Sequence, residues 1–84
     1  MQATKPTKEQ IQETSTWGTW EKEVSEFPWE YSEKEICYIL EGLVKVKYNN
    51  KEIVFSKGDL VIFPAGLKCI WEVIEPVKKV YKFE

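Results

Sequence analysis

Alternating apolar and polar residues recur along the second half of the chain. In one run, Val44, Val46 and Tyr48 alternate with Lys45 and Lys47. Because successive side chains of a strand point to opposite faces, this pattern predicts a half-buried β-strand. Shorter, mainly apolar runs predict further strands over residues 35–40, 51–55, 60–63, 68–73 and 77–83.

Turn-forming residues separate these runs. They are Glu41-Gly42, Asn49-Asn50, Ser56 to Asp59, Pro64 to Gly66 and Glu75-Pro76. Glycine and asparagine tolerate the positive φ angles of tight turns, and proline interrupts the hydrogen-bond ladder of a sheet. Short strands with turns at this spacing are typical of an all-β sandwich or barrel.

The first part of the chain has a different pattern. Residues 1–6 are polar, and we expect them to be mobile. Thr7 and Gln10 match a capping box, which predicts a short helix that ends near Thr14. Ile11 is the only apolar side chain of this helix, so we expect it to lie outside the sheet and cover an edge.

Aromatic residues are spread through a charged background over residues 17–31. Pro28 argues against a helix, so we expect two short strands or one bent strand, the last part being residues 27–31. In such a strand Trp29 and Tyr31 share one face of the sheet.

The predicted fold is therefore all-β, a barrel of about eight short antiparallel strands over residues 17–84. A tail and a short helix over residues 1–16 precede it. A chain of 84 residues suffices for one domain, whose core must be compact or shared with a second copy. Four Trp, four Tyr and four Phe suit a narrow barrel interior, because each brings a large buried area.

Composition excludes several kinds of function. The net charge of −2 argues against attraction to phosphate backbones, and we expect no nucleic-acid partner. The chain has no histidine, so it cannot by itself form a histidine-ligated metal site, a Ser-His or Cys-His pair, or an imidazole base. All twelve cationic residues are lysines, which leaves no guanidinium to clamp a carboxylate or phosphate.

Cys37 and Cys69 are the only cysteines, too few for a disulfide framework or a four-cysteine zinc site. No apolar run approaches the length of a membrane span, and the first residues lack the apolar core of a signal peptide. We therefore expect a soluble, cytoplasmic protein without a membrane partner.

Two spacings resemble the motifs of the cupin family. Cupins carry G-x5-H-x-H-x(3,4)-E-x6-G and, after a spacer, G-x5-P-x-G-x2-H-x3-N. Glu35 and Gly42 are spaced like the end of the first motif, and Gly58, Pro64 and Gly66 like the start of the second. The predicted barrel thus resembles the small single-domain cupins (RmlC-like jelly rolls) grouped with the ureidoglycine aminohydrolase cupin domain, most of which have no assigned function.

The resemblance implies a jelly-roll barrel with a ligand pocket at one mouth, often in a dimer. In many relatives a divalent metal is held there by three histidines and a glutamate. Of these four ligands only Glu35 is present, because Trp29 and Tyr31 stand at the histidine positions of the first motif and Cys69 at that of the second. The resemblance therefore implies a degenerate metal site, and we expect no cofactor.

Strand alternation within the family frame places Trp29, Tyr31, Glu35, Cys69 and Trp71 at a common interior. Our hypothesis is a small-molecule pocket with Trp29 and Trp71 as walls and Tyr31, Glu35 and Cys69 as polar contacts. The alternative is that the tryptophans simply fill a narrow barrel. Glu35 is the most informative residue, because burying a carboxylate among aromatic rings is costly unless it is paired or protonated.

Two classes of function stay open. The first is a small-molecule-binding protein without catalytic activity. The second is an enzyme on a small polar metabolite, aminohydrolase-like or isomerase-like, with Glu35 as general acid or base and Tyr31 or Cys69 assisting. A variant of the second binds a divalent metal, for which Glu35, Cys69 and Tyr31 would be atypical ligands.

Charged and apolar residues outside this group are assigned to the surface. We expect Lys68, Lys78 and Lys79 to belong to a solvated face, and we assign them to no site. Tyr38 and Leu40 point away from the barrel interior, where an apolar pair needs a cover, so we expect a homodimer.

Overall fold

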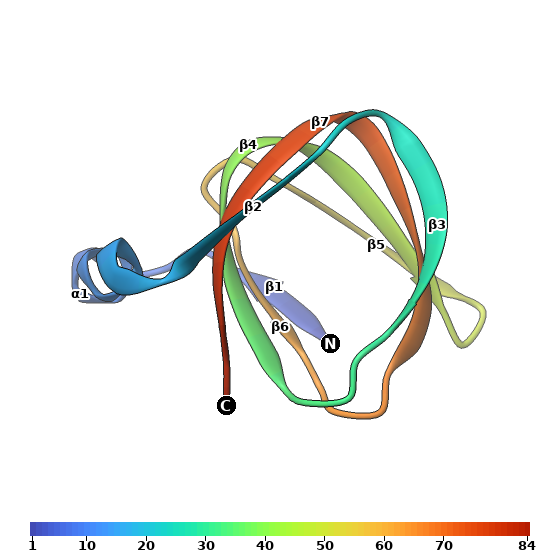
Figure 1. Cartoon of the computed structure of the whole chain (residues 1–84), viewed down its shortest axis with the longest axis horizontal. Coiled ribbons are helices and arrows are strands. Elements are labelled where there is room, and N and C mark those ends of the chain that lie inside the picture. Colours follow the sequence, from blue (N-terminus) through green and yellow to red (C-terminus); the bar gives the residue numbers. More distant parts are fainter.

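Two long strands, β4 (Glu35–Tyr48) and β7 (Lys68–Phe83), form the framework of the protein. In the computed structural model, which describes residues 1–84, they pair with each other in antiparallel fashion and curl into a barrel (Figure 1). The other elements are β1 (Gln2–Thr4), α1 (Lys8–Glu13), a 3₁₀ helix (Thr14–Thr16), β2 (Gly18–Lys22), β3 (Ser25–Glu30), β5 (Lys51–Ser56) and β6 (Leu60–Phe63).

The shorter strands add to this framework. β5 and β6 pair with β4, β2 and β3 pair with β7, and β1 pairs with β6, all antiparallel. The helix α1 lies outside the barrel wall (Figure 1). The all-β fold with one short helix, predicted from the sequence, is confirmed.

The turns predicted at Glu41-Gly42 and Glu75-Pro76 are wrong, because β4 and β7 bend there without ending. The sheet accordingly has seven strands. The pairing register of the two strands shifts between Ile39 and Val44, and across this irregularity the buried side of β4 changes from odd-numbered to even-numbered residues.

Gly42 makes this bend of the two strands possible. Its φ is +107°, and an added Cβ would lie 2.5 Å from the carbonyl oxygen of Pro76 and 2.7 Å from Cα of Val77. Only glycine combines the positive φ with such a close approach of two backbones. The residue that the sequence marks as a turn is therefore the crossing point of the two long strands.

The N-terminal segment is partly as predicted. The capping box is present, with Gln10 N donating to Thr7 Oγ1 at 3.2 Å and Thr7 N donating to Gln10 Oε1 at 2.9 Å. The expectation that residues 1–6 are mobile is wrong for Gln2–Thr4, which forms β1 against β6. An added strand satisfies backbone groups that the edge of β6 would otherwise expose.

Buried apolar side chains fill the barrel. The core consists of Tyr31, Cys37, Ile39, Val44, Val46, Phe55, Val61, Phe63, Cys69, Trp71, Val73 and Val77. The ring of Phe63 stacks on Tyr31 with centroids 4.5 Å apart, and Phe55 meets Trp71 edge-on at 5.6 Å. Aromatic rings thus form much of the interior, as a narrow barrel favours.

The outer face of β4 carries Tyr38 and Leu40, both half-buried. The homodimer expected from them stays a prediction. No helix of the protein is both long enough and apolar enough to cross a membrane.

Candidate functional site

A buried ion pair joins the two long strands. Lys79 Nζ on β7 lies 2.6 Å from Glu35 Oε2 on β4, and each side chain is only 6% exposed. The expectation that Lys79 belongs to a solvated face is therefore wrong. On β7, Val77 and Lys79 are both buried and Lys78 between them is not, so alternation turns Lys79 inward.

Aromatic rings surround the Lys79 ammonium. Its Nζ lies 4.9 Å from the ring centroids of both Trp20 and Trp71, and 5.7 Å from that of Tyr81. Trp20 comes from β2, where it pairs directly with Lys79. The negative faces of the rings attract the cation and replace part of the hydration that it loses on burial.

Beside this ion pair lies a cavity of about 110 Å³. Seven aromatic residues and the two charged ones line it: Trp20, Phe27, Trp29, Tyr31, Glu35, Trp71, Lys79, Tyr81 and Phe83. Trp29 and Phe83 are about half exposed, at 53% and 51%, whereas Trp71 is 2% exposed. The cavity thus has a buried floor and an aromatic rim that faces solvent.

The connection between β3 and β4 positions Tyr31. Its backbone N–H donates to Leu67 O at 2.9 Å, and its carbonyl oxygen accepts from Gly66 N at 2.6 Å, which ties this connection to the loop before β7. The two connections lie side by side at one end of the barrel (Figure 1). The phenol oxygen accepts a hydrogen bond from Trp71 Nε1 at 3.1 Å.

Burial, and secondly the charge of Glu35, raise the pKa of Tyr31 well above its usual range. The phenol therefore stays neutral at physiological pH. Since its oxygen accepts from Trp71, its own O–H proton remains able to donate to a ligand in the cavity.

Cys69 is buried but does not line the cavity. Its Sγ donates to the carbonyl oxygen of Trp29 at 3.6 Å, and burial raises the pKa of its thiol to about 11. Burial raises the pKa of Cys37 to about 12. Both thiols are therefore protonated at neutral pH, and neither is poised as a nucleophile.

Of the five site residues predicted from the sequence, Trp29, Tyr31, Glu35 and Trp71 line one cavity and Cys69 lies outside it. Sequence reasoning missed the other lining residues, Trp20, Phe27, Lys79, Tyr81 and Phe83. The sequence of β7 could have identified Lys79, because it lies two residues from both Val77 and Tyr81 and therefore shares their face of the strand. A lysine within an apolar stripe indicates a buried cation with a partner.

The donors at this site do not suit the divalent metal of many cupins. Metal ligands must lose their protons, whereas burial raises the pKa of both Tyr31 and Cys69. Glu35 already accepts from the Lys79 ammonium, a cation that would repel a metal ion. No group of three or more His, Cys, Asp or Glu side chains in the protein is arranged so that it could hold a metal ion.

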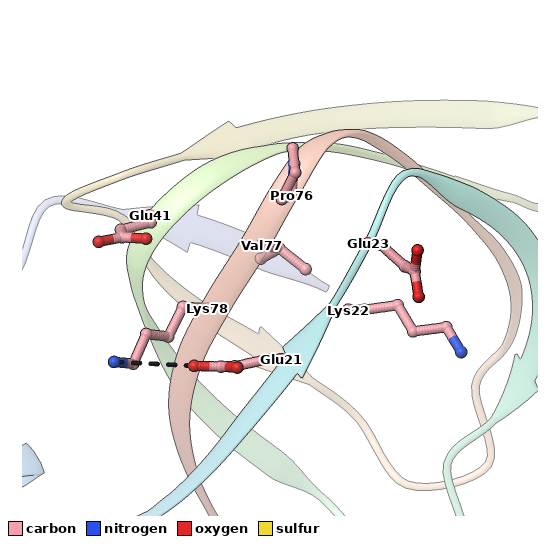
Figure 2. A pocket seen from close by; sticks show the side chains of 7 residues that line it. All are labelled: Glu21, Lys22, Glu23, Glu41, Pro76, Val77 and Lys78. Atoms are coloured by element: carbon pink, nitrogen blue, oxygen red, sulfur yellow. Dashed lines mark ion pairs between the residues drawn. The ribbon is translucent and has the colours of Figure 1, made fainter.

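A larger hollow, of about 550 Å³, lies where β2 leads into β3 beside the bend of β7 (Figure 2). Its lining residues are Glu21, Lys22, Glu23, Glu41, Pro76, Val77 and Lys78. Figure 2 shows Lys78 paired with Glu21, at 3.7 Å, with both side chains largely exposed. Charged groups that are already hydrated contribute little free energy to ligand binding. We therefore place the candidate site in the aromatic cavity.

Comparison with known proteins identifies the family. The model of the EutQ-like cupin domain matches residues 9–81. The chain belongs to this cupin family. No curated protein matches it.

Solved cupin structures resemble the chain over most of its length. A DUF861 family protein from Thermotoga maritima is 51% identical, with a TM-score of 0.95, over 99% of this chain and 98% of that one. EutQ from Clostridium difficile is 24% identical, with a TM-score of 0.73, over 79% of this chain and 52% of that one.

A putative ethanolamine utilization protein EutQ from Salmonella typhimurium is 23% identical, with a TM-score of 0.73, over 96% of this chain and 66% of that one. At this identity the two EutQ structures show the fold alone. The cupin resemblance seen in the sequence is thereby confirmed, whereas none of these matches singles out the ureidoglycine aminohydrolase group.

Proposed function

We propose that this cupin binds a small molecule in the aromatic cavity. The ligand has a planar or apolar body, which packs between the rings, and one polar group, which reaches Glu35 and Lys79. A cavity of about 110 Å³ is smaller than the roughly 300–1,000 Å³ of sites for drug-sized ligands. We therefore infer a small metabolite, or the end of a larger one that extends past Trp29 and Phe83.

The observation that carries this proposal is the position of the ion pair at the cavity wall. A barrel that merely filled its interior would be expected to use apolar side chains, since replacing a buried ion pair by well-packed apolar residues is often neutral or stabilising. Glu35 and Lys79 instead lie beside a cavity with an aromatic rim, together with the O–H of Tyr31. Small-molecule sites are typically apolar cavities that contain a small number of polar groups.

NMR of the tryptophan indole N–H groups tests the proposal. Trp20, Trp29 and Trp71 line the cavity, whereas Trp17 does not and serves as an internal reference. A panel of small carboxylic acids, amides, amines and carbonyl compounds is added to the full chain. We expect at least one class to shift the first three signals and leave that of Trp17 unchanged.

Two variants control this experiment. The double variant Glu35→Gln with Lys79→Met removes the charges without leaving one unpaired, and it should lose the response. Glu30→Gln changes an exposed glutamate next to Tyr31 in the chain and should keep it. The proposal fails if no class shifts the three signals, or if Trp17 responds equally.

The same ion pair favours a second function, metal-free acid–base catalysis on a small polar metabolite. A carboxylate and an ammonium 2.6 Å apart at a cavity wall are able to exchange a proton and to deliver it to a bound molecule. Conversion of any compound that binds in the NMR panel, lost in the double variant, would establish this activity.

A further inference from the structure

One lysine of this protein differs from all the others. Of the twelve lysines, Lys79 alone is buried, at 5% exposure. Its side chain nevertheless lines the aromatic cavity, and Nζ lies 4.9 Å from the ring centroids of Trp20 and Trp71, which line the same cavity. Burial and access are thus combined at a single amine.

The proton of this amine has an acceptor in place. Glu35 Oε2 lies 2.6 Å from Nζ, and Glu35 lines the same cavity. An amine attacks a carbonyl carbon only in its unprotonated form, so a nearby carboxylate that takes and returns protons assists every step of the addition. Lysines in apolar pockets serve as Schiff-base nucleophiles in other proteins, because loss of hydration favours the neutral amine over the ammonium.

We propose that Lys79 forms a Schiff base with a small aldehyde or ketone bound in the aromatic cavity. This inference rests on the proposed function, because the carbonyl compound is the ligand of that site. The aromatic walls pack against its apolar part, and the carbonyl carbon lies against Nζ.

The reaction balances with the groups present. Glu35 accepts one proton from the ammonium, and the amine nitrogen forms a bond to the carbonyl carbon as the C=O π bond breaks. Glu35 returns the proton to the resulting oxygen, which gives a carbinolamine. A second proton passes from nitrogen through Glu35 to the hydroxyl, water leaves, and an iminium ion remains on Lys79.

Reductive trapping in the unaltered full chain tests the proposal. The chain is mixed with propanal at low concentration and with sodium cyanoborohydride, which reduces an iminium ion to a stable amine, and modified lysines are identified by peptide mass spectrometry. We expect Lys79 to be modified first and faster than any other lysine. A purely structural buried lysine would be the slowest of all, so modification of the exposed lysines with Lys79 spared overturns the proposal.

Variants separate the nucleophile from its neighbours. The double variant Glu35→Gln with Lys79→Met should lose the fast adduct, and Lys78→Met, which alters the adjacent exposed lysine, should keep it. Glu35→Asp keeps the charge but moves the carboxylate away from Nζ, and it should slow adduct formation by roughly a hundredfold. An unchanged rate in Glu35→Asp overturns the role given to Glu35.

A non-reacting analogue distinguishes failure of this proposal from failure of the proposed function. Propanamide has the size of propanal but forms no Schiff base. If it shifts the Trp71 indole signal while propanal never modifies Lys79, the cavity binds ligands and the Schiff base is refuted. If neither compound shifts the signal and Lys79 stays unmodified, both proposals fail for this ligand class.

Discussion

Lys78 and Lys79 are adjacent on β7, yet their ion pairs lie in opposite surroundings. Lys78 pairs with Glu21 at 3.7 Å with side chains 42% and 68% exposed, whereas Lys79 pairs with Glu35 at 2.6 Å with both side chains 6% exposed. Strand alternation alone separates them, because it turns one side chain to water and the other into the barrel. Two Lys–Glu pairs of the same chemical type thus differ in their contribution to stability and in their access to a ligand cavity.

The difference follows from solvation. An exposed pair gains little, about 0–1 kcal/mol, because water and salt screen the attraction. A buried pair has lost its hydration, so each charge depends on the other, and removal of one partner is destabilising by about 3–5 kcal/mol. Four predictions test this difference in stability between groups inside the barrel and groups on its surface.

Glu35→Gln should give the largest effect, a loss of about 3–5 kcal/mol in the free energy of unfolding, because it leaves the Lys79 ammonium buried without its partner. Denaturant unfolding measures it. The double variant Glu35→Gln with Lys79→Met should recover most of the loss. A loss below about 1 kcal/mol in the single variant would mean that the interior pair is solvated like an exterior one.

Tyr31→Phe should be destabilising by about 1–3 kcal/mol, because the buried Trp71 indole N–H loses the phenol oxygen that accepts from it. Unfolding by urea, followed by tryptophan fluorescence, measures the change. Tyr38→Phe is the matched control on the outer face of β4, and it should lie within about 0.5 kcal/mol of the parent. Equal effects at the two tyrosines would contradict the hydrogen bond.

The Cys37 thiol should make stability depend on alkaline pH. Burial raises its folded-state pKa from 9.0 to about 12, and the charge of Lys79 opposes this rise only in part. Below pH 9 both states hold the proton. Between the two pKa values only the folded state holds it, so stability falls by about 1.4 kcal/mol per pH unit as pH rises.

Cys37→Ala removes this thiol and leaves every other titratable group of the chain in place. Unfolding free energies at about pH 8 and about pH 10.5 should fall more steeply in the parent. Parallel slopes would show that Cys37 titrates as it does in the unfolded chain.

Glu21→Gln should give the smallest effect, between about 0 and 1 kcal/mol, because its partner Lys78 stays hydrated. Added salt should reduce even this difference, whereas it should leave the effect of Glu35→Gln nearly unchanged. Thermal unfolding at low and high salt provides the measurement. An effect as large as that of Glu35→Gln would remove the distinction between the two pairs.

Much of the fold could be predicted because its signals are local. Alternation around Val44 and Val46 predicts a strand, and Thr7 with Gln10 predicts the helix start, both as observed. The continuation of β4 through Gly42 could not be predicted, because the same glycine suits a turn and a close crossing with Pro76. Only the position of β7 decides between the two.

The candidate site was predicted in part. The cupin spacing identified Glu35, and alternation in the strands indicated the face of Trp71. Lys79 was missed because adjacent lysines usually indicate a solvated face, and its partner lies 44 residues away in the sequence. Cys69 fills a motif position, but its thiol points to the Trp29 carbonyl oxygen rather than to the cavity.

By itself the sequence determined the class of fold, the helix cap and the absence of imidazole and guanidinium chemistry, because residue type and short-range periodicity suffice for these. The tertiary structure alone decided which charges meet. The register of β4 on β7 and of β2 on β7 brings Glu35, Lys79 and Trp20 together from distant parts of the chain. Since the energy of a charge depends on what surrounds it, the chemistry of this site appears only once the barrel has closed.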